Sequence, residues 1–119
     1  MQREALKFLF DVQRACALIS DFISGIDEEQ WCANAMVRSA VERQFITIGE
    51  ALQQAVRVDP ALDGRITDFR RIVNFRNVMV HGYARVEPRT VWGVVQQDLP
   101  ELAAQVSALL QPFLDELDG

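Results

Sequence analysis

One short segment, from Arg76 to Tyr83, brings together side chains that could act on a phosphate by acid–base chemistry. It contains His81, the single histidine of the chain, whose ordinary pKa lies close to neutral, so that it can take or give a proton. Arg76 carries a permanent charge on a planar set of donors that suits phosphate oxygens. Asn77 adds a polar amide, and Tyr83 adds a hydroxyl that can donate or accept. Together these groups permit metal-independent cleavage of RNA.

In such a reaction His81 abstracts the proton of the ribose 2′-hydroxyl or protonates the leaving oxygen. Arg76 stabilises the extra negative charge that develops on the phosphorus in the transition state. Because the 2′-hydroxyl is the nucleophile, RNA is cut and DNA is not. One histidine cannot easily serve as both acid and base, whereas two chains around a two-fold axis would supply two. The segment therefore predicts a homodimer that acts on RNA without a metal or cofactor.

The same residues also have a purely structural interpretation. A lone histidine near a helix C-terminus is often a cap or a partner of the helix dipole, and an arginine nearby is often part of a surface salt bridge. At about 100° per residue, Asn77 and His81 share a helix face, whereas Arg76 and His81 lie about 140° apart. Chemistry alone therefore favours the structural interpretation. Whether Arg76 and His81 can reach the same phosphate depends on how the helix ends and on a second chain.

The charge of the chain is unevenly distributed. Its 119 residues have a formal net charge of −5, which by itself argues against binding to nucleic acid. Residues 57–89, however, hold seven arginines and four acidic residues, a local net charge of +3 around the motif. A local basic patch can hold phosphate because fields are screened within about 10 Å. The alternative is a solvated face of mixed charge.

The amino-acid composition excludes several classes of protein. Half of the residues are hydrophobic, which is enough for one domain over residues 1–119. Cys16 and Cys32 form no CxxC pair and have one histidine to join them, so a zinc site is not expected. Free buried thiols indicate a reducing compartment. The start lacks the pattern of a signal peptide, and no apolar run is long enough to span a membrane. We therefore expect a cytoplasmic protein.

Periodic apolar residues predict helices over residues 2–24, 28–58 and 67–80, and another from residue 88 onward. Asp27 is suited to cap the second helix, and His81-Gly82 to end the third. Pro100 falls inside the last pattern, where it should kink the helix or start a new one capped by Asp98. Short connections then favour an all-α, up-down four-helix bundle, with the last helix kinked or split, that dimerises.

The motif and two other segments resemble a known family. Residues 76–83 match the Arg-x4-His-x-Tyr motif of HEPN domains, in particular that of HepT-like toxins. Residues 48–51 resemble the Ile-Gly-Glu-Ala signature of that family, and residues 91–100 resemble the segment that follows its motif. The order and spacing fit over nearly the whole chain. One departure is Phe69, which stands where a tryptophan is expected in many relatives.

The resemblance implies a dimeric helical ribonuclease whose active site lies in a cleft between the two chains. Arg76 and His81 would form the catalytic pair, with Asn77 assisting. Members of this family are typically toxins, paired with a minimal nucleotidyltransferase antitoxin that transfers AMP onto the motif tyrosine, here Tyr83. The added bulk and negative charge would exclude RNA phosphate from the groove. Glu50 would pair with Arg76 or a neighbouring arginine, or remain an exposed charge.

Two other functions remain open at this level. The chain could be a non-catalytic module that binds a nucleotide or a partner through the same groove, which its acidic net charge favours slightly. It could also be a helical dimer that serves as a scaffold, although the complete motif argues against this interpretation.

Overall fold

Every regular element is helical in the computed structural model of the chain, which describes residues 1–81 and 86–118. The predicted all-α class is therefore confirmed. The first half of the chain forms α1 (Arg3–Phe22), α2 (Glu28–Ala33) and α3 (Ala35–Val58). A short 3₁₀ turn, η1 (Pro60–Gly64), then leads to α4 (Phe69–His81) and α5 (Pro88–Asp118).

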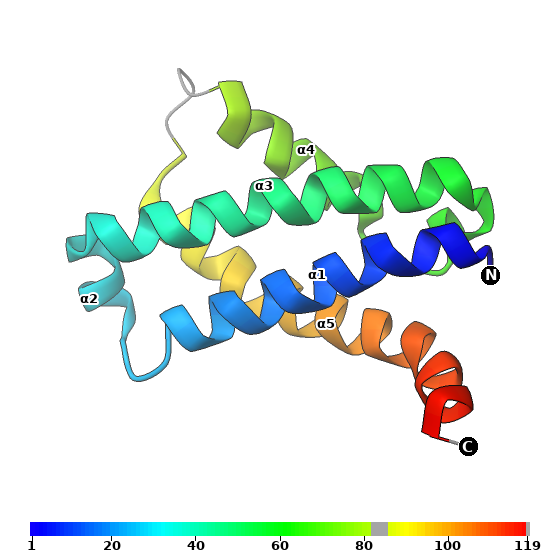
Figure 1. Cartoon of the computed structure of the whole chain (residues 1–119). Coiled ribbons are helices and arrows are strands. Elements are labelled where there is room, and N and C mark those ends of the chain that lie inside the picture. Colours follow the sequence, from blue (N-terminus) through cyan, green and yellow to red (C-terminus); the bar gives the residue numbers. More distant parts are fainter. Residues whose placement is uncertain (82–85, 119) are drawn as a thin grey trace.

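The long helices α1, α3, α4 and α5 run in alternating directions, as the up-down topology requires (Figure 1). The helices α1 and α3 lie side by side along most of their length, and α4 packs on another side of α3. The helix α5 contacts α1 and α2. The C-terminal end of α4, the helix that carries Arg76 and His81, points away from α3 and projects from the bundle (Figure 1).

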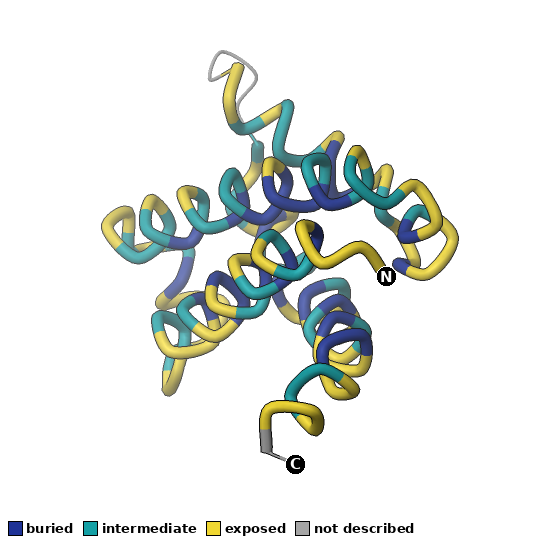
Figure 2. The backbone as a smooth tube through the Cα atoms, turned by 45° about the vertical axis from the view of Figure 1, so that its right-hand side comes forward, coloured by how far each residue is buried: buried dark blue, intermediate teal, exposed yellow. Residues whose placement is uncertain are grey.

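The core is apolar, and each of the longer helices contributes buried residues to it, drawn in dark blue in Figure 2. Trp31 of α2 is completely buried, and its indole Nε1 donates a hydrogen bond to the carbonyl oxygen of Pro88 at 2.8 Å. This bond ties the second helix to the start of the fifth. Among the described residues no helix is both long and apolar enough to cross a membrane.

The prediction of one continuous helix over 28–58 is wrong, because Asn34 interrupts it. The backbone of Asn34 has φ −112° and ψ 89°, and its side chain caps α3 by accepting a hydrogen bond from the Val37 amide. The Arg38 guanidinium donates to the carbonyl oxygens of Trp31 and Cys32, which lie at the end of α2. Asparagine competes with helical hydrogen bonding in this way because its side chain is short and polar.

Two other predicted helix boundaries also differ from the structure. The helix α4 begins at Phe69 and not at residue 67, since Asp68 adopts a positive φ of 61°. Thr67, just before it, exchanges two hydrogen bonds with the Gln105 side chain of α5. The helix α5 continues through Pro100, so the predicted option of a new helix capped by Asp98 is wrong.

The ends of the other predicted helices differ from the structure by one or two residues. The first helix spans Arg3–Phe22 and not 2–24, and α4 ends at His81 and not at residue 80. The predicted cap at Asp27 is confirmed, because its carboxylate accepts from the Gln30 amide at 2.8 Å. Gly82, expected to end the motif helix, lies outside the described residues.

Candidate functional site

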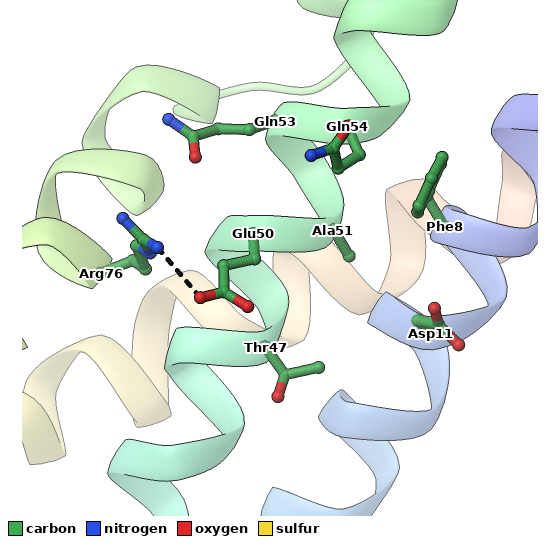
Figure 3. Close-up of a pocket in the computed structure, with 8 residues that line it drawn as sticks. All are labelled: Phe8, Asp11, Thr47, Glu50, Ala51, Gln53, Gln54 and Arg76. Carbon is green, nitrogen blue, oxygen red and sulfur yellow. Dashed lines mark hydrogen bonds and ion pairs between the residues drawn. The ribbon is translucent and has the colours of Figure 1, made fainter. Parts of the chain in front are cut away.

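The guanidinium of Arg76 is held by two polar side chains. Arg76 projects from α4 towards α3, where its Nη2 donates to Glu50 Oε1 at 2.9 Å (Figure 3). Its Nη1 donates to Asn77 Oδ1, also at 2.9 Å. The Arg76 side chain is 23% exposed and that of Glu50 is 51% exposed, so the pair lies at the surface with the arginine stem covered. Glu50 thus pairs with Arg76 and at the same time remains exposed, so both alternatives expected for it hold in part.

Gly49 allows α4 to approach α3 closely enough for this contact. A Cβ atom at position 49 would lie 2.3 Å from Arg76 Cβ and 2.5 Å from Arg76 Cγ. Carbon atoms in contact are normally about 3.5–4.0 Å apart. Only glycine therefore lets the arginine stem cross α3 at this height. The sequence contained a signal for this role, since a glycine inside a helix usually destabilises it by about 0.5–1 kcal/mol and needs a reason to be there.

The hydrogen-bonding capacity of Arg76 exceeds what its described neighbours supply. A guanidinium has five N–H donors. The Nε atom of Arg76 is buried and has no hydrogen-bond partner within residues 1–81 and 86–118. An unpaired buried donor of this kind is rare and calls for an explanation, such as a role at a binding site. The arginine is thus oriented by Glu50 and Asn77 and is not saturated by them.

His81 is the last residue of α4 and is exposed to solvent. Because the helix remains α-helical through this residue, the angular offset of about 140° from Arg76 persists within one chain. Asn77 lies on the His81 side of the helix, and its amide oxygen accepts a hydrogen bond from the Arg76 guanidinium. Of the three residues predicted to be catalytic, Arg76 and Asn77 are in contact, and His81 follows at the end of the same helix.

Tyr83, the predicted site of adenylylation, lies outside the described residues.

The basic segment around the motif is partly neutralised by ion pairs within the fold. Arg70 pairs with Asp63 at 3.5 Å, and Arg71 pairs with Asp98 at 3.2 Å. For Arg70 and Arg71, these pairs favour the alternative of a solvated face of mixed charge.

A groove of about 460 Å³ lies beside Arg76, and we call it the Arg76 groove. Its floor is α3, and its two walls are α4, which carries Arg76, and α1 (Figure 3). The side chains that line it are largely polar, with one aromatic ring: Phe8, Asp11, Thr47, Glu50, Ala51, Gln53, Gln54 and Arg76. Two of these residues, Glu50 and Arg76, were predicted to belong to the site. Ala51 belongs to the segment that resembles the Ile-Gly-Glu-Ala signature, and the others carry no recognisable motif in the sequence.

Neither cysteine takes part in this groove. Cys16 is buried in the core, and burial raises the pKa of its thiol to about 12, which keeps it protonated and unreactive at neutral pH. Cys32 is half-buried and has a free thiol. In the part of the chain that the structure describes, no three His, Cys, Asp or Glu side chains gather closely enough to hold a metal ion.

Comparison with known proteins places this architecture in a family. The family model described as "Ribonuclease HepT-like" matches residues 12–109. A protein of Methanocaldococcus jannaschii named as a candidate RNase is 27% identical over 88% of this chain and 95% of its own length. A candidate ribonuclease HepT of Thermococcus cleftensis is 28% identical over 92% of this chain and 98% of its own length. A candidate RNase of Caldanaerobacter subterraneus is 24% identical over 87% of this chain and 92% of its own length. No solved structure gives a significant match.

Proposed function

The chain belongs to the HepT-like ribonuclease family, and on this premise we propose that it is an RNA endonuclease that uses Arg76 and His81 as its catalytic pair. The observation that carries the proposal is the arrangement of Arg76 between Glu50 of α3 and Asn77 of α4. An arginine with no role beyond exposure at the surface would not need a glycine opposite the aliphatic part of its side chain. The contacts fit a guanidinium that is positioned before substrate arrives, which is how transition-state charge is stabilised most effectively.

In the proposed reaction, the ribose 2′-hydroxyl attacks the adjacent phosphorus and the 5′-oxygen of the next nucleotide leaves. One histidine takes the hydroxyl proton and a second protonates the leaving oxygen. Arg76 donates hydrogen bonds to the phosphoryl oxygens, which become more negative in the transition state. Glu50 and Asn77 keep the guanidinium in place, and no metal ion is needed.

The proposal includes a homodimer. Arg76 and His81 lie on different sides of α4, so one copy of the helix presents them to one phosphate poorly. Two α4 helices related by a two-fold axis would offer two arginines and two histidines to the same cleft. His81 ends the segment of α4 that projects from the bundle, which suits a residue that meets a second chain.

The test is RNA cleavage by purified protein in the presence of EDTA. Wild type should cleave, His81→Ala should lose about 10²-fold or more in rate, and Arg76→Ala about 10²–10³-fold. Glu42→Ala is a matched control, since Glu42 lies on α3 outside the groove. Unchanged cleavage by His81→Ala in a clean preparation would contradict the proposal.

We further propose that the protein is the toxin of a toxin–antitoxin pair, whose partner nucleotidyltransferase adenylylates Tyr83. The intact mass of protein co-expressed with that enzyme should increase by one or more AMP units, and the increase should disappear in Tyr83→Phe. An unchanged mass would instead indicate inhibition by occlusion of the site.

The second candidate function is a non-catalytic module that binds a nucleotide or a partner. The net charge of −5 and the neutralisation of Arg76 by Glu50 favour it. Growth on expression separates the two functions: a ribonuclease arrests growth, with rescue by His81→Ala or Arg76→Ala, whereas a binding module does not.

A further inference from the structure

The Arg76 groove has dimensions suited to one small organic group. Its volume of about 460 Å³ falls within the range of about 300–1,000 Å³ that is typical of ligand sites. Ala51 lies in the middle of the floor, where its small side chain leaves depth between the walls (Figure 3). Space of this size accommodates one nucleotide and excludes a base-paired duplex.

The side chains of the groove are those that recognise unpaired bases. Phe8 stands on the α1 wall across the floor from Arg76, and Gln54 lies between them on α3 (Figure 3). Single-stranded RNA is recognised by stacking of splayed-out bases on aromatic rings and by hydrogen bonds to the base edges. Gln53 and Gln54 each offer both a donor and an acceptor, and Thr47 adds a hydroxyl.

The charges separate the groove into two ends. At one end is Arg76, which suits a phosphate, and at the other is Asp11 of α1, which repels one. Glu50 lies between them and already accepts from Arg76. Lys7 holds its ammonium 4.9 Å from the centre of the Phe8 ring, a contact that an exposed lysine gives up at little cost. A neutral group that donates hydrogen bonds therefore fits the Asp11 end better than an anion.

We propose that the Arg76 groove is a base-specificity subsite that binds one unpaired guanine of the RNA substrate. The guanine stacks on Phe8, and the adjacent N1–H and N2–H donors of its Watson–Crick edge face the carboxylate of Asp11. The phosphate of the same nucleotide lies at the Arg76 end, next to the cleavage site. This assignment rests on the proposed ribonuclease function for its biological meaning, whereas the binding itself does not depend on cleavage.

The test is titration of the full-length protein with 5′-GMP, which has no internucleotide bond to cleave, followed by NMR of the glutamine side-chain amides. The side-chain signals of Gln53 and Gln54 should shift, and 5′-GMP should bind more tightly than AMP, CMP or UMP. Phe8→Leu should weaken binding at least fivefold, the lower limit for loss of one stacked base. Asp11→Asn should abolish the preference for GMP over AMP.

Two control variants separate the groove from general effects on the fold. Phe10→Leu changes a half-buried aromatic residue of α1 that does not line the groove, and Asp21→Asn changes an exposed acid of the same helix. Both should bind 5′-GMP like wild type. Equal weakening by Phe8→Leu and Phe10→Leu, absence of shifts at the two glutamines, or equal affinity for the four nucleotides would each overturn the subsite. Failure of RNA cleavage with GMP binding intact would overturn the ribonuclease proposal and leave the subsite standing.

Discussion

Replacing Gly49 by alanine provides a sharp test of the contact between α3 and α4. A glycine-to-alanine change inside a helix normally stabilises a protein by about 0.5–1 kcal/mol, because alanine loses less backbone entropy on folding. Here the new Cβ would lie 2.3 Å from Arg76 Cβ. To regain a normal separation of about 3.5–4.0 Å, α4 or the arginine stem must retreat by more than an ångström.

Overpacking of this kind costs about 1–3 kcal/mol, which outweighs the gain in helix propensity. Gly93→Ala is the matched control, because Gly93 also lies inside a helix and has open space where its Cβ would stand. The alanine preference is common to both variants, so the difference between their unfolding free energies measures the clash directly. We expect Gly49→Ala to be less stable than Gly93→Ala by about 2 kcal/mol.

The assay is urea denaturation followed by far-UV circular dichroism, with RNA cleavage measured on the same preparations. Gly49→Ala should also cleave more slowly than wild type, because displacement of Arg76 from α3 lengthens its bond to Glu50. Equal stability of the two alanine variants, together with full activity of Gly49→Ala, would refute the role assigned to this glycine.

Three other changes test separate parts of the structure. Glu50→Gln should alter the unfolding free energy by less than about 1 kcal/mol, because the Arg76–Glu50 ion pair is partly exposed. It should nevertheless slow RNA cleavage, because Arg76 is held less firmly. A cleavage rate equal to that of wild type would contradict the positioning role of Glu50. Trp31→Phe should destabilise the fold by about 1–3 kcal/mol in the same urea assay, because the Pro88 carbonyl loses its donor; an unchanged midpoint would contradict this bond. The pKa of the Cys16 thiol is about 12 in the folded protein, against an ordinary value of 9.0. Between pH 9 and 12 the thiol therefore ionises only in the unfolded chain, so the free energy of unfolding should fall as the pH rises above 9. The Cys16 contribution reaches about 1.4 kcal/mol per pH unit, and Cys16→Ala should show a shallower decline in parallel denaturation series.

The sequence predicted the elements of the fold well, because its helices have strong apolar periodicity and clear end signals. Asp27 and Pro88 mark helix starts that the structure confirms. The break at Asn34 was missed, because the decisive bonds come from one asparagine side chain and from Arg38.

The site was predictable only in part. The motif identified Arg76 and Asn77, and the structure brings these two residues into contact. A glycine inside a helix signalled some special role for Gly49, and Arg76 was one of the partners expected for Glu50. Which role and which partner depend on how closely α3 approaches α4, and no local pattern records that distance. Phe8 and Asp11 were not predicted for the same reason, since they join the groove from a helix far away in the sequence.

The most direct test of the central claim uses one single-stranded RNA oligonucleotide and a copy that carries a 2′-deoxyribose at the cleaved position, both incubated with the protein in EDTA. Because the 2′-hydroxyl is the proposed nucleophile, the RNA should be cut to a product ending in a 2′,3′-cyclic phosphate, and the deoxy-substituted copy should resist cleavage. Arg76→Ala should cut the RNA about 10²–10³ times more slowly than wild type. Cleavage of the deoxy-substituted copy at the same position, or cleavage that requires a divalent metal ion, would contradict the mechanism.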